Sequence, residues 1–190
     1  AWGCNQYAQL GDGTRENRAS PTQVRLTDGS PLTGVVEATG GYRHTLARTA
    51  DGRCWAWGYG GEGQLGDGSY SYDPRLYPVA VLRGPGLPLT GVAGIAAGVY
   101  YSLAFLDDGS LWSWGDNSRY QLGDPAISSR AYAGPVLRDD TGEPLTGVVA
   151  VAAGWYHTVA LTADGRIWVC GCNTYGMLGI GSETDQPRVT

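Results

Sequence analysis

The sequence has 190 residues and a formal net charge of −5, and all 13 of its basic residues are arginine. The absence of lysine excludes P-loop and Schiff-base chemistry, and the acidic balance argues against direct nucleic-acid binding. This stretch contains neither a transmembrane nor a signal segment. We therefore expect a soluble protein with no membrane partner, in a compartment that the sequence does not reveal.

One structural unit recurs along the chain. A Trp-Gly pair at Trp2-Gly3 returns at Trp57-Gly58 and Trp114-Gly115, and Cys170-Gly171 takes its place in the last copy, in steps of 55, 57 and 56 residues. A Leu-Gly pair follows each of them at a fixed distance, at Leu10-Gly11, Leu65-Gly66, Leu122-Gly123 and Leu178-Gly179. Self-similarity on such a period indicates a repeat architecture.

Three short strands and a fourth, proline-containing segment are predicted in each copy, in the same order. The first strand ends in small residues and glycine, the second begins with His or Tyr, and the third alternates tryptophan with small residues. In chain order the segments are residues 21–24 alone, then 35–40, 44–47, 54–57 and 78–81, then 92–98, 101–104, 111–114 and 135–137, and finally 148–154, 157–160, 167–170 and 187–189. Proline in the fourth segment indicates an edge strand.

An Asp-Gly dipeptide separates the second and third strands of every copy, at Asp51-Gly52, Asp108-Gly109 and Asp164-Gly165. Asp-Gly between apolar runs predicts a hairpin turn of type I′, in which both central residues have positive φ. Because these aspartates recur with the repeat, turn chemistry explains them better than catalysis does.

Four antiparallel strands per copy, with small residues on the first and proline on the last, predict an all-β protein with the blades of a β-propeller. We expect one partial propeller over residues 1–190. In it, residues 1–32 form an outer half-blade and connector, and residues 33–89, 90–145 and 146–190 form blade units. A β-sandwich is the alternative, but it does not require the same hairpin on one period.

Two segments carry a resemblance to a known family. They are residues 153–161, Ala-Gly-Trp-Tyr-His-Thr-Val-Ala-Leu, and residues 114–123, Trp-Gly-Asp-Asn-Ser-Arg-Tyr-Gln-Leu-Gly. Over essentially its whole length the chain resembles the regulator of chromosome condensation repeat family. The resemblance implies a seven-bladed propeller, of which this chain would form about half. We expect a segment of a longer protein, with the ring completed by the rest of that protein or, as the alternative, by a second copy.

A glycine-rich stretch at residues 58–63 matches the Gly-x-Gly-x-x-Gly pattern of dinucleotide sites. The other copies have asparagine in place of Gly60, at Asn5, Asn117 and Asn173. Since Asn and Gly both tolerate left-handed backbone, the pattern predicts a turn, and no helix is predicted after it to hold a pyrophosphate.

The two histidines, His44 and His157, share one position of the repeat, which Tyr101 fills in the middle copy. A position that accepts His or Tyr requires a ring with a polar tip, so we expect a hydrogen bond within the blade rather than catalysis. Residues 170–172, Cys-Gly-Cys, offer two possible ligands without nearby histidines, which is a weak zinc pattern. We therefore expect no catalytic residue, no cofactor and no metal.

The loop between the first two strands varies while the rest of the repeat stays constant. Its variable residues are Tyr42-Arg43, Val99-Tyr100 and Trp155-Tyr156, and they should emerge on one face of the ring. Large aromatic residues and arginine in exposed loops are typical of binding hot spots. Our leading hypothesis is a non-enzymatic scaffold that binds another protein, of unknown identity, through this face. The alternative is that some of these side chains fold back over the blade ends.

The family resemblance also implies two alternative functions. One is guanine nucleotide exchange on a small GTPase, with the required wedge on blades outside this segment, and the other is secreted enzyme inhibition through an aromatic face. Light-sensing plant members carry Gly-Trp-Arg-His-Thr in the variable loop. Here Tyr42 replaces the tryptophan and Tyr156 replaces the arginine, so a photoreceptor role is disfavoured.

Overall fold

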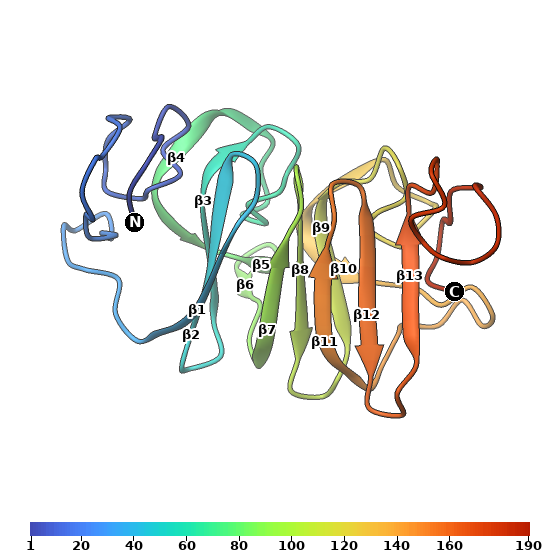
Figure 1. Cartoon of the computed structure of the whole chain (residues 1–190). Coiled ribbons are helices and arrows are strands. Elements are labelled where there is room, and N and C mark those ends of the chain that lie inside the picture. Colours follow the sequence, from blue (N-terminus) through green and yellow to red (C-terminus); the bar gives the residue numbers. More distant parts are fainter.

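The computed structural model describes all 190 residues and contains strands, turns and loops but no helix (Figure 1). The first sheet consists, in spatial order, of β1 (Val35–Gly40), β2 (His44–Thr49), β3 (Cys54–Gly60) and β4 (Ser71–Ala80). The second consists of β7 (Val92–Ala97), β8 (Tyr101–Leu106), β9 (Leu111–Asp116) and β10 (Ser129–Pro135). The third consists of β11 (Val148–Ala153), β12 (His157–Thr162) and β13 (Ile167–Gly171). A small hairpin of β5 (Leu82–Gly84) and β6 (Leu87–Pro88) follows the first sheet in the chain.

The three larger sheets stand side by side as antiparallel blades, which confirms the predicted all-β propeller architecture (Figure 1). Strand β7 contacts both β1 and β11, so the first strands of successive blades converge. The chain termini lie at opposite ends of the row of blades. Apolar clusters fill both junctions: one contains Leu46 and Trp114, and the other contains Leu111 and Cys170.

Some strands differ from the predicted segments in extent. Residues 1–32 form isolated bridges, such as that between Gly3 and Arg18, instead of full strands. At the outer edge of the third sheet, residues 187–189 form no strand, and Val169 and Thr190 exchange two backbone hydrogen bonds of 3.1 Å. By contrast, β4 and β10 begin well before their proline segments, so part of the predicted loop is strand.

The Asp-Gly turns are three-residue loops, and the prediction of type I′ turns was wrong. In the first blade the Gly52 N–H donates to the Thr49 carbonyl (2.9 Å), and the Thr49 N–H donates to the Arg53 carbonyl (3.0 Å). Gly52 has a φ of 76°, whereas Asp51 is not among the residues with positive φ. This is a type I turn followed by a left-handed glycine. Asp51 acts instead through its carboxylate, which accepts a hydrogen bond from the Thr49 hydroxyl (2.6 Å).

The asparagines after the third strands do not adopt the left-handed backbone that the sequence suggested. Among non-glycine residues only Ala8 and Tyr120 have positive φ, three positions after the asparagines of their copies. The buried Asn117 accepts a hydrogen bond from the Leu122 N–H (2.8 Å) and donates to two backbone carbonyls. The loop is therefore held by side-chain hydrogen bonds of asparagine, and the left-handed residue lies elsewhere in it.

One backbone carbonyl in each of the first three of these loops joins neighbouring blades. The Gln64 carbonyl accepts hydrogen bonds from the Trp114 indole nitrogen (2.9 Å) and from the Ser102 hydroxyl (2.9 Å), both of the second blade. The arrangement recurs for Gln9 with Trp57 (2.8 Å) and Thr45 (2.8 Å), and for Gln121 with Cys170 (3.8 Å) and Thr158 (2.7 Å). We call each such trio a carbonyl clamp. The clamps explain why the Trp-Gly position and the Thr or Ser position repeat together.

The Leu-Gly pairs are explained by the same junctions. Gly66 has a φ of 67°, and a Cβ on it would lie 2.9 Å from the indole nitrogen of Trp114. Gly179 holds the same place in the last copy with a φ of 68°, yet a Cβ there would meet nothing within 4 Å. Both positions favour glycine for its left-handed backbone, but only Gly66 also has no room for a side chain.

The position shared by histidine and tyrosine connects neighbouring blades, so the predicted hydrogen bond within the blade was wrong. Nε2 of His44 lies 3.0 Å from the Ser102 hydroxyl of the second blade. In the second blade, the Tyr101 hydroxyl donates to the His157 carbonyl of the third. Burial lowers the pKa of His44 to about 4, so its imidazole is neutral at pH 7. The repeat period in the sequence does not show that the hydrogen-bond partner of a side chain lies in the neighbouring blade.

Candidate functional site

The variable loop residues surround one hollow at the end of the blades opposite the Asp-Gly turns. The loops β1–β2, β7–β8 and β11–β12 line an open cavity of about 490 Å³. Its large side chains are Tyr42, Val99, Tyr100, Trp155 and Tyr156. The structure thus brings five of the six predicted residues to a single cavity.

These side chains differ in exposure. Tyr42 is 62% exposed and Trp155 is 78% exposed, whereas Val99, Tyr100 and Tyr156 are half-buried. Tyr100 packs edge-on against Tyr42, with 6.0 Å between the ring centroids, and burial raises the pKa of its hydroxyl. The alternative that some of these side chains fold back over the blade ends therefore holds in part for Tyr100. Trp155, by contrast, projects into solvent.

Arg43, the sixth predicted residue, lies among tyrosines beside the hollow. Its guanidinium carbon is 4.2 Å from the ring centroid of Tyr7, 4.9 Å from that of Tyr42 and 6.0 Å from that of Tyr59. The Tyr59 ring itself packs against the rings of Tyr7 (5.8 Å), Tyr72 (6.3 Å) and Tyr100 (6.1 Å). Each exposed cation–π contact of this kind stabilises the arrangement by about 0.5–1 kcal/mol. We call Arg43 with Tyr7, Tyr42, Tyr59, Tyr72 and Tyr100 the tyrosine cluster.

Three members of this cluster were missed by the sequence reasoning, namely Tyr7, Tyr59 and Tyr72. Tyr7 and Tyr59 follow Trp-Gly pairs at the end of a third strand. In an antiparallel blade the third strand ends where the second begins, so this geometry places them beside the variable loop. Tyr72 follows Ser71, which pairs with Gly60 at the same end of the sheet. Strand direction was therefore the available signal for Tyr7 and Tyr59, whereas Tyr72 lies in a segment that was predicted to be loop and was placed only by the structure.

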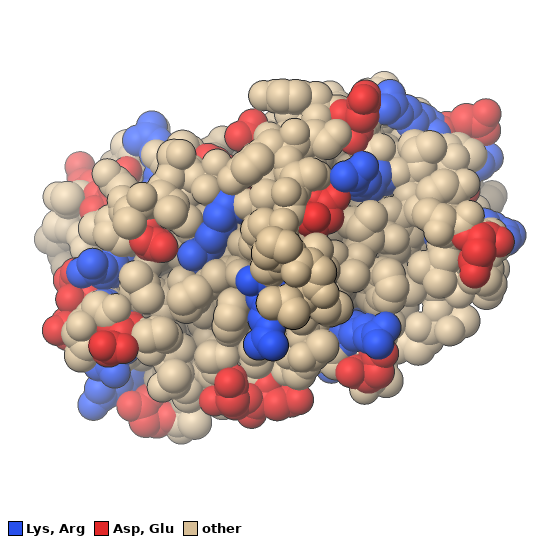
Figure 2. All heavy atoms as spheres, turned by 180° about the vertical axis from the view of Figure 1, so that it is seen from behind, with Lys and Arg blue, Asp and Glu red and all other residues tan.

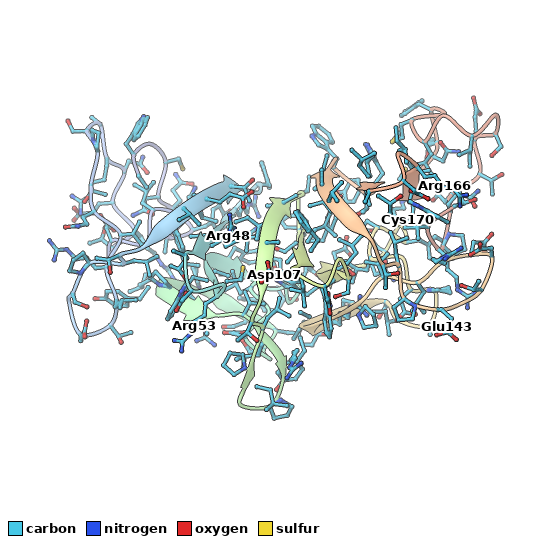
Figure 3. The ribbon with its side chains drawn as sticks, turned by 90° about the horizontal axis from the view of Figure 1, so that it is seen from below. Arg48, Arg53, Asp107, Glu143, Arg166 and Cys170 are labelled. Carbon is cyan, nitrogen blue, oxygen red and sulfur yellow. The ribbon has the colours of Figure 1, made fainter.

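The opposite face carries the Asp-Gly turns and has different chemistry. Figure 3, a view from below, shows Arg53, Asp107 and Arg166 on that side. Arg53 and Arg166 each pair with the aspartate of their own turn, at 3.4 Å and 3.3 Å. Acidic and basic side chains are also interspersed over the back of the molecule (Figure 2). These surfaces are charged but mixed in sign, unlike the aromatic loop face.

Other side chains that could support chemistry are buried or scattered. No three His, Cys, Asp or Glu residues lie close enough to hold a metal ion. Burial raises the pKa of the Cys54 and Cys170 thiols to about 12, so both stay protonated and unreactive at pH 7. None of the four cysteines forms a disulfide. The structure also contains no helix that is long and apolar enough to cross a membrane.

Comparison with protein families gives matches along the chain. The model for the regulator of chromosome condensation (RCC1) repeat matches residues 1–48, 51–105, 108–161 and 164–189. A second model of the same repeat matches residues 35–64, 92–121 and 148–176. These matches confirm the resemblance that the Trp-Gly and Ala-Gly-x-x-His segments indicated.

Individual relatives are similar over nearly the whole chain but are longer. The ultraviolet-B receptor UVR8 of Arabidopsis thaliana is 31% identical over 98% of this chain and 40% of the receptor. The crystal structure of human WBSCR16 superimposes with a TM-score of 0.76 at 26% identity, over 100% of this chain and 46% of that one. Yeast RCC1 (Prp20), solved bound to Kap60, gives a TM-score of 0.72 at 26% identity, over 100% of this chain and 43% of that one. The chain thus spans less than half of each of these relatives.

Proposed function

Because the chain belongs to the regulator of chromosome condensation repeat family, we propose that it is a non-enzymatic scaffold whose loop face binds another protein. The observation that carries this proposal is the contrast between a recurring frame and a varying face. The carbonyl clamps repeat from blade to blade, whereas the loop before each second strand presents different side chains: Tyr42 and Arg43, then Val99 and Tyr100, then Trp155 and Tyr156.

The chemistry of the loop face suits a protein partner. Aromatic side chains bury about 150–250 Å² each in a contact, and their few rotatable bonds lose little entropy. Trp155, at 78% exposed, makes no ring–ring contact with the tyrosines, so a partner can cover most of it. The hollow beside it provides the concave shape into which a side chain of the partner fits.

Similar proteins support a binding role. Yeast Prp20 has been solved bound to the protein Kap60, and a second study of it concerns its binding to Gsp1p and histones. Because this chain spans 43% of that protein, we infer from the comparison only that a protein is bound, and not which protein. We therefore assign the loop face to protein binding and leave the partner unnamed.

A five-residue alanine variant tests the proposal. Tyr42, Arg43, Tyr100, Trp155 and Tyr156 are all replaced by alanine, and a matched variant replaces Arg53 and Arg166 on the opposite face. Partners captured from the source cells by the unaltered chain are identified by mass spectrometry, and each purified pair is measured by titration calorimetry. We expect the loop variant to lose binding by at least about 100-fold, since hot-spot residues contribute about 2 kcal/mol or more each. The opposite-face variant should bind normally, and normal binding by the loop variant would refute the proposal.

Guanine nucleotide exchange on a small GTPase is the second candidate function. Its support is the similarity to yeast Prp20, which has been studied for binding to Gsp1p. The test is the rate of release of labelled GDP from purified small GTPases, with and without this protein. Accelerated release that survives the five-residue replacement would assign exchange to another surface.

A further inference from the structure

Arg43 differs from most other arginines of the chain because no carboxylate neutralises it. Eight arginines form ion pairs with aspartate or glutamate, and Arg43 is not among them. The loops after the third strands show the usual arrangement, with Arg18–Asp12 at 2.7 Å, Arg75–Asp67 at 2.8 Å and Arg130–Asp124 at 3.5 Å. Arg43 therefore presents a free positive charge at the blade ends of an acidic protein.

The partners of Arg43 are aromatic rings, which hold it without cancelling its charge. Three tyrosine rings have centroids within 6.0 Å of the guanidinium carbon. A ring attracts a cation through its quadrupole but accepts no full hydrogen bond from the five guanidinium N–H groups. Burial raises the pKa of Tyr59 and of Tyr100, so these hydroxyls stay neutral at pH 7 and can donate hydrogen bonds to an anion. The Glu62 carboxylate also raises the pKa of Tyr59, but it forms no ion pair with Arg43, so the guanidinium of the cluster is available to an external anion.

We propose that the tyrosine cluster binds the carboxylate of an aspartate or glutamate in an extended segment of the partner protein, with Arg43 as its charge partner. This inference rests on the proposed function and specifies the chemistry of the partner at the same face. A planar guanidinium matches a single carboxylate through two parallel hydrogen bonds. Phosphate recognition, by contrast, commonly uses several arginines, and the cluster contains only Arg43.

The cluster also gives the bound segment a direction. Tyr100 and Tyr156 occupy the place of Arg43 in the other two copies, so the charge exists only over the first blade. The hollow beside the cluster is lined over the third blade by Trp155 and Tyr156. The acidic residue of the partner therefore lies over the first blade, and an apolar residue farther along the same segment lies over the third.

A paired peptide array tests the carboxylate site. Each short peptide is printed in two versions that differ only in having Asp and Glu or the isosteric Asn and Gln. The unaltered chain should retain acidic versions about tenfold more strongly than amide versions, which is the size expected for one charged hydrogen-bonded contact. Arg43→Gln should remove this preference, and Arg43→Lys should restore only part of it. Arg53→Gln, which removes an arginine from the opposite face, should leave the preference unchanged.

The outcomes separate this inference from the proposed function. Equal retention of both versions by the unaltered chain, or an undiminished preference in Arg43→Gln, would overturn the carboxylate site. The loop face would still stand as a binding surface if the five-residue alanine variant lost all peptides. Stronger retention of phosphorylated versions would assign the cluster to phosphate and overturn the inference. Retention of no peptide by the unaltered chain would overturn the extended acidic segment and leave the loop face to be judged by the capture experiment.

Discussion

Two tryptophans of this chain illustrate the difference between its frame and its loop face. Trp114 is fully buried, and its indole nitrogen donates to the Gln64 carbonyl of the preceding blade. Trp155 is 78% exposed at the rim of the hollow. The first tryptophan is one of a series that recurs on the period of the repeat, and the second occurs once. Repetition within the chain thus marks residues that join blades, and departure from repetition marks residues that remain available to a partner.

The largest expected effect is the loss of a frame tryptophan. Trp114→Ala removes a buried ring and one arm of a carbonyl clamp, so we expect the free energy of unfolding to fall by about 3–5 kcal/mol. Urea denaturation followed by tryptophan fluorescence measures the change. Trp155→Ala is the control, and a loss of similar size in that variant would remove the distinction between frame and face.

Acidification should weaken the frame through His44. The pKa of this buried imidazole is about 4 in the folded chain, against an ordinary value of 6.5. The unfolded chain therefore takes up a proton at a higher pH than the folded chain, so the stabilisation is complete above pH 6.5 and is lost as the pH falls toward 4. The loss should amount to about 3 kcal/mol for this group.

His44→Gln isolates this contribution. Its free energy of unfolding should vary less between pH 6.5 and 4 than that of the unaltered chain, as measured by urea denaturation at several pH values. Hydrogen bonds from neighbouring Thr and Ser hydroxyls hold the pKa values of the aspartates of the Asp-Gly turns below the ordinary value for aspartate, so these groups contribute little in this pH range. Identical pH profiles in the two proteins would show that His44 is not the group responsible.

A pair of glycine variants compares the same repeat position with and without a tryptophan ring packed against it. Gly66→Ala and Gly179→Ala both place alanine in left-handed backbone, which costs about 1–2 kcal/mol. Only Gly66→Ala also brings a Cβ against the Trp114 ring, so its free energy of unfolding should fall by about 1–3 kcal/mol more than that of Gly179→Ala. The difference between their thermal unfolding midpoints measures the cost of packing the new Cβ against the Trp114 ring. Equal midpoints would mean that the junction adapts to the extra methyl group.

The smallest effect on stability is expected at the loop face. Both residues are mostly exposed, so replacement of Trp155 by alanine should change the free energy of unfolding by less than about 0.5 kcal/mol. Replacement of Tyr42 should lower it by about 1 kcal/mol, because that ring contacts Arg43 and Tyr100. Calorimetry of the double variant measures this directly. A loss of several kcal/mol would show that the hollow is part of the core rather than a surface for a partner.

The architecture could be predicted from sequence because the period, the Asp-Gly turns and the alternating tryptophans all indicate the same blade. The details that failed depend on side-chain hydrogen bonds. Asn117 and Asp51 act through their side chains, whereas their residue types suggested a role for left-handed backbone. The partner of His44 lies in another blade, and a comparison of aligned copies contains no information about such contacts.

The candidate site was predictable in part for a related reason. Tyr42 and Trp155 were visible because they vary within a constant frame, and the structure places them at one hollow. Tyr59 lies in a stretch that was interpreted only as a turn, although strand direction brings it to the same face. The free charge of Arg43 depends on which carboxylates lie near it, and that is a property of the folded chain alone.

The central claim is that a partner covers the loop face and leaves the Asp-Gly face free. Amide hydrogen exchange on the complex with a partner identified by capture tests it most directly. We predict new protection in residues 41–43, 98–101 and 154–157, with unchanged exchange in the turns at residues 50–53, 107–110 and 163–166. Protection confined to the turns, or spread equally over both faces, would contradict the account.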